Sequence, residues 1–175
     1  MTTPSLYRRV LGPQFAGLSP VLRQFHDSTP AEATGSITIE HGRWPCGWLA
    51  WLVGLPPAAE NCPAKLAVRG SPAGETWDRQ FGSSRFVTRQ RERDGLLVEA
   101  MGTVTVGFAV EVAGGALSLA SRRVWWLGIP LPAWLGPRIV ARAEEDQQGG
   151  WNIDVRVQVP LFGKLLRYHG KVTPP

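Results

Sequence analysis

The feature that most constrains the fold of this chain is a long series of short segments in which apolar and polar residues alternate. The series runs from Lys65 to Val172, and turns that contain glycine or proline separate the segments. Alternation with a period of two is typical of strands with one buried face, and Asp94-Gly95 and Gly114-Gly115 are typical hairpin turns. The pattern predicts strands at residues 34–41, 64–70, 74–81, 85–92, 96–101, 103–112, 116–126, 138–146, 151–159 and 163–172.

Strands joined in series by short turns cannot remain flat, because twist accumulates from one strand to the next. We therefore expect a mainly β (α+β) protein, an antiparallel β-barrel or strongly curved half-barrel of about nine to ten strands. Short N-terminal helices should pack on it, since Thr3-Pro4 and Ser19-Pro20 are helix-start signals and Gly12-Pro13 stops the first helix. The 175 residues should form one domain, with helices and first strand in 1–60 and a β-meander in 61–175.

The segment 44–55 (WPCGWLAWLVGL) is rich in tryptophan, and its apolar residues follow helical spacing. Pro45 near its start and Gly54 near its end frame a short helix. Because this helix is apolar on nearly all sides, it is expected either to be buried as a plug over the sheet or to lie against a membrane or a partner.

Bulk composition excludes several classes of function. The formal net charge of +5 permits anionic partners, but the basic residues are scattered and mixed with acids, so no nucleic acid is expected. Cys46 and Cys62 lack a metal-ligand spacing, so we expect reduced thiols, no metal and a cytoplasmic location. The first twelve residues lack the apolar core of a signal peptide, and no run reaches the roughly 18 apolar residues that span a bilayer.

Residues 75–81 (ETWDRQF) predict a binding cavity. Strand parity places Glu75, Trp77, Arg79 and Phe81 on one face, and the large aromatic side chains make that face the interior. Arg79 is then directed inward, which is unfavourable unless the guanidinium meets a carboxylate or a polar ligand.

Two further residues are candidates for acid–base chemistry or for ligand contact. Glu99 is the lone charge on the apolar strand 96–101, with Arg79 or Arg138 as its natural partner, and a structural ion pair is the alternative to a functional role. Parity directs Tyr168 inward and His169 outward, so these two are not expected to act together.

The segment 125–135 (WWLGIPLPAWL) is irregular yet almost entirely apolar. It is expected to cover one mouth of the barrel, as a lid over a ligand entrance, as a hydrophobic cap on the core or as a partner interface. Trp125 and Trp134 would contribute to the pocket in the first case. His26 falls in the last turn of the second helix, where the helix dipole favours a cation, and a catalytic base is the minority interpretation.

Several groups of residues, spread over almost the whole chain, together resemble one known family. They are residues 6–12 (LYRRVLG), Trp77-x-Arg79-x-Phe81-Gly82-x-x-x-Phe86, Leu96-Leu97-Val98-Glu99, residues 127–132 (LGIPLP) with Pro137-Arg138, and Val157-x-Val159-Pro160-Leu161-x-Gly163 with Tyr168-x-Gly170. This pattern resembles the bacterial family known as domain of unknown function 4166, although the segment 44–51 and the hairpin around Asp94 depart from it. Members are often fused behind a nicotinamide-dependent, Rossmann-type reductase domain, so the resemblance implies work beside a redox or biosynthetic enzyme.

The function that these residues favour is the binding of a largely apolar small molecule, lipid-like or polyketide-like, without cofactor or metal. An enzyme of cyclase or isomerase type that uses Glu99 or Tyr168, and an interaction domain that docks an NAD(P)-dependent reductase, are the alternatives. Contact with a membrane is less favoured. The expected ligand-binding residues are Trp77, Arg79, Phe81, Glu99, Trp125, Trp134, Arg138 and Tyr168.

Overall fold

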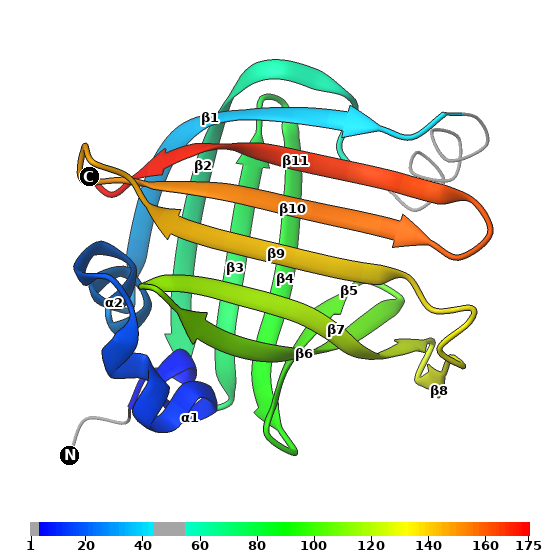
Figure 1. The fold of residues 1–175 in the computed structure, drawn as a ribbon, viewed down its shortest axis with the longest axis horizontal. Coiled ribbons are helices and arrows are strands. Elements are labelled where there is room, and N and C mark those ends of the chain that lie inside the picture. Colours follow the sequence, from blue (N-terminus) through cyan, green and yellow to red (C-terminus); the bar gives the residue numbers. More distant parts are fainter. Residues whose placement is uncertain (1–3, 44–54) are drawn as a thin grey trace.

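The computed structural model describes residues 4–43 and 55–175, and it is a closed antiparallel β-barrel with N-terminal helices at one end (Figure 1). Ten strands form the ring, and a two-residue strand, β8, is added beside it. The helices are α1 Leu6–Leu11, the 3-10 helix η1 Gly12–Gly17 and α2 Pro20–Asp27. The strands are β1 Ala31–His41, β2 Ala59–Ser71, β3 Gly74–Phe81, β4 Ser84–Arg93, β5 Leu96–Met101, β6 Val104–Ala113, β7 Ala116–Trp126, β8 Ile129–Pro130, β9 Arg138–Glu145, β10 Trp151–Val159 and β11 Gly163–Thr173.

The ring is closed by pairing between strands that are far apart in the sequence. Neighbours along the chain pair as hairpins from β1 to β7 and from β9 to β11. β9 then pairs with β7, with Leu117 opposite Ala143, and β11 pairs with β1, with Thr34 opposite Thr173. Each strand of the ring thus has two hydrogen-bonded neighbours, and the predicted barrel is confirmed in its closed form.

The helices form where the sequence predicts them, with one shift at the start. α1 begins at Leu6 rather than after Thr3, because the Ser5 hydroxyl accepts a hydrogen bond from the Arg8 backbone N–H. α2 follows Ser19-Pro20 as expected. The two helices lie over one end of the barrel and bury Leu22 and Phe25 in its core (Figure 1).

Some predictions fall outside the part of the chain that the structure describes. The expected helix in the tryptophan-rich segment covers residues 44–54, and Cys46 lies there as well. Cys62 lies on β2 and is a free thiol. In the residues that are described, no helix is both long and apolar enough to cross a membrane.

Two glycines allow β1 and β11 to approach closely. A Cβ atom on Gly170 would overlap the backbone carbonyl oxygen of Ser36, and one on Gly35 would overlap that of Lys171. Glycine inside a strand commonly marks such a close approach of two backbones. Because β1 and β11 close the ring, these glycines support closure directly.

Replacing Gly170 by alanine is expected to destabilise the barrel by about 1–3 kcal/mol, because the strands must separate to admit the methyl group. Urea unfolding followed by circular dichroism measures the change. The control is Gly17→Ala, where the added methyl would lie at an ordinary 3.5 Å from Val112 Cγ1. Equal stability of Gly170→Ala and the unmodified protein would contradict the role assigned to the close approach.

Candidate functional site

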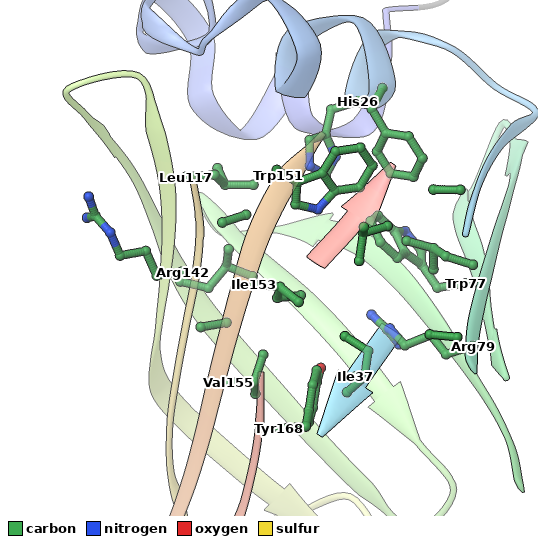
Figure 2. A pocket seen from close by; sticks show the side chains of 18 of the residues that line it. His26, Ile37, Trp77, Arg79, Leu117, Arg142, Trp151, Ile153, Val155 and Tyr168 are labelled. Carbon is green, nitrogen blue, oxygen red and sulfur yellow. The ribbon is translucent and has the colours of Figure 1, made fainter. Parts of the chain in front are cut away.

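The barrel encloses a cavity of about 130 Å³ beneath the helices. Side chains from α1, α2 and all ten strands of the ring line it, and most of them are apolar (Figure 2). Leu117, Ile153 and Val155 point into it, whereas the Arg142 side chain is directed away. The cavity is therefore the space that remains inside the ring after the apolar side chains have packed.

Strand β3 supplies the aromatic and charged residues that parity predicts. Trp77, Arg79 and Phe81 face the cavity, and Asp78 on the opposite face pairs with Arg85 at 2.6 Å. Glu75 is also turned inward, where its carboxylate accepts hydrogen bonds from Trp77 Nε1 at 3.0 Å and from the backbone N–H of Leu6 at 3.3 Å. Burial raises the pKa of Glu75, and the bond from Trp77 opposes that rise.

Arg79 is paired inside the barrel with Glu99 of β5. Its Nη1 lies 3.0 Å from Glu99 Oε1 and 2.7 Å from Thr88 Oγ1, and the Thr88 hydroxyl donates to the same carboxylate oxygen at 2.5 Å. The side chains of Arg79 and Glu99 are only 14% and 9% exposed. Burial disfavours the guanidinium charge, but Glu99 together with Tyr168 and Tyr7 outweighs this, so the pKa of Arg79 is raised.

The expected partnership of Glu99 with a buried cation is thus present, and Arg79, not Arg138, supplies the cation. Thr88 was missed by sequence analysis, although parity on β4 places it opposite Trp77. The Arg79 guanidinium also lies 5.0 Å from the Trp77 ring centroid, at cation–π distance.

Several polar atoms of this cluster remain available to the cavity. Among the described residues, Nε and Nη2 of Arg79, Oε2 of Glu99 and the hydroxyl of Tyr168 have no hydrogen-bond partner. Tyr168 packs on Phe81 with ring centroids 5.6 Å apart. Burial raises the pKa of Tyr168, so its phenol is protonated at neutral pH.

His26 lies in a different environment from the one that its sequence position suggests. It is buried against Tyr7, with ring centroids 4.0 Å apart, and against Trp77, at 5.7 Å. Burial lowers its pKa to about 3, and its Nδ1 has no partner among the described residues. His26 therefore lies in the last turn of the second helix as expected, but its imidazole is neutral, because desolvation inside the barrel outweighs the helix dipole.

Tyr7 and Gln90 complete the helix end of the cavity. The Tyr7 hydroxyl donates to Gln90 Oε1 at 3.2 Å, and both residues line the cavity. Burial, with the nearby carboxylates of Glu99 and Glu75, raises the pKa of Tyr7 well above its usual value. Sequence reasoning missed both residues, although Tyr7 belongs to the apolar helical stripe and Gln90 is a polar residue on an inward strand position.

Three predicted site residues do not reach this cavity. Trp125 and Arg138 line a separate groove, and Trp134 is 68% exposed. The segment after β7 folds back because β8 pairs with β7, placing Ile129 opposite Trp126. No residue of the segment 125–135 lines the cavity beneath the helices.

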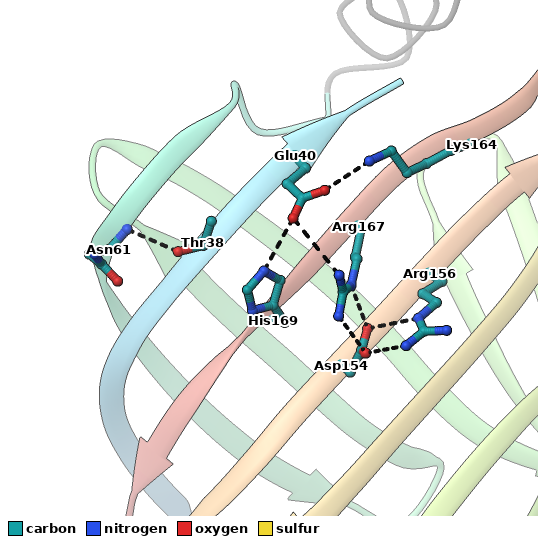
Figure 3. A network of polar contacts seen from close by, with 8 residues as sticks. All are labelled: Thr38, Glu40, Asn61, Asp154, Arg156, Lys164, Arg167 and His169. Atoms are coloured by element: carbon teal, nitrogen blue, oxygen red, sulfur yellow. Dashed lines mark hydrogen bonds and ion pairs between the residues drawn. The ribbon is translucent and has the colours of Figure 1, made fainter. Parts of the chain in front are cut away.

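His169 lies on the outer face, as parity predicts (Figure 3). It contacts Glu40 of β1 at 3.3 Å, and Glu40 also pairs with Lys164 at 2.8 Å. On β10, Asp154 pairs with Arg156 and Arg167, whose hydrogen bonds lower its pKa to about 2. These exposed contacts join neighbouring strands and are separate from the interior site.

The fold and the site together define a β-barrel protein with an apolar cavity and an internal ion pair. The chain belongs to the family described as domain of unknown function (DUF4166), whose model matches residues 18–172. No curated protein matches the chain in sequence.

Among solved structures, the chain is similar to a protein of unknown function from the DUF3598 family of Nostoc punctiforme. The TM-score is 0.53 at 10% identity, over 84% of this chain and 47% of that one, so the chain spans about half of that protein's length. This likeness concerns the fold. A putative thioesterase II from Thermobifida fusca matches over 100% of this chain and 88% of that one at 10% identity, but its TM-score of 0.28 carries no argument.

Removing either partner of the buried ion pair is expected to destabilise the fold. Removing both partners should cost less than the two single losses added together. Arg79→Met and Glu99→Gln should each destabilise the fold by about 3–5 kcal/mol, because each leaves a buried charge without its partner. The double variant should lose clearly less than the sum, since neither charge remains. Urea unfolding of the four proteins measures the coupling, and strictly additive losses would show that the two side chains do not interact.

Burial of neutral His26 should make stability depend on pH. The folded pKa of about 3 lies below the ordinary 6.5, so the unfolded chain binds the proton first as pH falls below about 6.5. Relative to a His26→Phe variant, the protein should lose about 2 kcal/mol of unfolding free energy between pH 7.5 and pH 5. The control His41→Gln retains His26 and should keep this loss. Parallel pH profiles for the His26→Phe variant and the unmodified protein would refute the assignment.

Proposed function

We propose that the barrel binds a small, largely apolar molecule inside its cavity. The observation that carries the proposal is an apolar space inside the ring, lined by Arg79, Glu99 and Tyr168, whose side chains keep hydrogen-bonding atoms without partners among the described residues. Polar groups buried in an apolar interior are normally satisfied. A ligand that brings its own polar atom satisfies them, with Trp77 and Phe81 as the surrounding apolar wall.

The volume of the cavity limits the size of the ligand that it can hold. An engineered cavity of about 150 Å³ holds one benzene molecule, whereas drug-sized ligands need about 300–1,000 Å³. The cavity of about 130 Å³ therefore matches a single ring or a short branched chain. A lipid-like or polyketide-like ligand would place only one end or one ring here.

The charge of the site favours a neutral oxygen on the ligand. Arg79 is already compensated by Glu99, so a carboxylate would add an unpaired negative charge beside Glu99. A hydroxyl or ketone oxygen accepts from the unused Arg79 nitrogens at much lower cost, and a hydroxyl also donates to Glu99 Oε2. The ion pair thus acts as a neutral hydrogen-bonding group with both a donor side and an acceptor side.

The same geometry supports an enzyme without cofactor as a second candidate. Glu99 Oε2 would act as base and the protonated Tyr168 hydroxyl as acid on a bound ketone, as in an isomerisation or cyclisation. What favours this candidate is that Glu99 and Tyr168 both line the same cavity, and that Oε2 of Glu99 and the Tyr168 hydroxyl have no partner among the described residues. Action beside an NAD(P)-dependent reductase is the biological setting that the family resemblance suggests.

Three probes of one ring each test the proposed ligand chemistry. Phenol should bind more tightly than benzene, which lacks the oxygen, and more tightly than benzoate, which adds a charge. Tyr168→Phe should weaken phenol binding about fivefold to tenfold through the lost hydrogen bond and leave benzene binding unchanged. Titrations followed by backbone amide chemical shifts measure affinity and location together.

Mass spectrometry of compounds extracted from the purified protein complements this test. A co-purifying molecule should be largely apolar and carry a neutral oxygen. Tightest binding by benzoate would refute the neutral-ligand argument, and failure of all three probes together with an empty extract would refute the cavity as a binding site.

A further inference from the structure

The end of the barrel opposite the helices exposes large apolar side chains. They belong to the β7–β9 connection, residues 126–137, in which β7 ends, β8 turns back and β9 begins (Figure 1). The exposed fractions are 53% for Trp126, 64% for Leu127, 66% for Ile129, 68% for Trp134 and 48% for Leu135. Five exposed large apolar side chains within one short connection are typical of an interaction surface.

A second turn projects from the same end. The β10–β11 turn carries Leu161, 91% exposed, and Phe162, 55% exposed. Figure 1 shows this turn and the β7–β9 connection at the same end, and Arg138 at the start of β9 is paired with Gln158 near the end of β10. Exposed apolar side chains from two separate connections therefore lie at the same end of the barrel.

Arginines surround this apolar surface. A β-bulge opposite Gly107 and Phe108 leaves Arg122 without a strand partner, so the consecutive Arg122 and Arg123 are both exposed. Together with Arg138 they line a groove of about 560 Å³ whose apolar wall includes Trp125 and Leu131. Trp125 is held at the groove because Gly107 leaves room for its ring.

The charge of these arginines is not neutralised locally. Within the described parts of the chain, Arg122, Arg123 and Arg138 take part in no ion pair within 4.0 Å. The sequence from residue 116 to residue 138 contains no aspartate or glutamate. The surface thus carries apolar side chains in its turns and positive charge in the adjacent groove.

We propose that this end of the barrel docks on a bilayer that contains anionic phospholipids. Exposed tryptophan, leucine and isoleucine side chains enter the boundary between headgroups and acyl chains, and the arginines bind lipid phosphates in the groove. The charge complementarity between three unpaired arginines and an anionic surface selects this occupant over a neutral apolar one. This proposal does not depend on the cavity holding a ligand.

Flotation of the full chain with vesicles tests the proposal. The protein should bind vesicles of phosphatidylcholine with phosphatidylglycerol more strongly than vesicles of phosphatidylcholine alone. The triple variant R122Q/R123Q/R138Q should bind the anionic vesicles on the order of 100-fold more weakly, at roughly fivefold for each arginine. The double variant W126A/W134A should lose at least about tenfold and should bind poorly even at low salt, where charge attraction is strongest.

A matched control removes the same charge from another face. R69Q/R89Q/R91Q also deletes three exposed arginines, from β2 and β4, and should bind as the unmodified protein does. Circular dichroism of each variant confirms that the barrel is retained. An equal loss in the control would show that net charge alone drives binding and would overturn the docking site, as would absence of binding to anionic vesicles. A concentration-dependent dimer that W126A/W134A abolishes, without vesicle binding, would assign the surface to a second copy instead.

Discussion

Closure of the hydrogen-bonded ring is the constraint on which the other features depend. Pairing of β11 with β1 and of β7 with β9 connects segments that are far apart in the chain, and it leaves each strand of the ring with two neighbours. A closed ring of ten strands has a fixed interior, which side chains either fill or leave as a cavity. Gly35 and Gly170 matter for this reason, because they permit the close approach of the two strands that complete the ring.

A closed interior also determines the chemistry of the charges inside it. Arg79 cannot lose its proton, so the fold provides Glu99 and Thr88 as partners within hydrogen-bonding distance. The pairing uses one guanidinium nitrogen and one carboxylate oxygen, and the other polar atoms of these two cavity-lining side chains have no partner among the described residues. The result is a buried ion pair with no net charge, which can still donate hydrogen bonds to a ligand and accept them from it. Structural pairing and ligand contact, posed as alternatives from the sequence, are compatible because they use different atoms.

The residues that the sequence placed correctly are those governed by strand parity. Trp77, Arg79, Phe81 and Tyr168 all face the cavity, as a period of two requires once the buried face is known. Parity is a local property, fixed by backbone geometry within each strand, so the rest of the protein does not alter it. The partnership of Arg79 with Glu99 was foreseeable for a related reason, since a buried charge restricts its partners to the few opposite charges on inward positions.

The residues whose surroundings the sequence did not determine lie where no such period applies. The environment of His26 depends on how a short helix packs over the barrel end, and packing against Tyr7 and Trp77 outweighs the local effect of the helix dipole. The segment of Trp134 was expected to be a lid, a cap on the core or a partner interface, and hydropathy alone does not choose among these; Trp134 is exposed. In an irregular connection beside unpaired arginines, the same apolar residues face outward. Their exposure is itself the evidence for an external surface, which the sequence alone could not separate from a core.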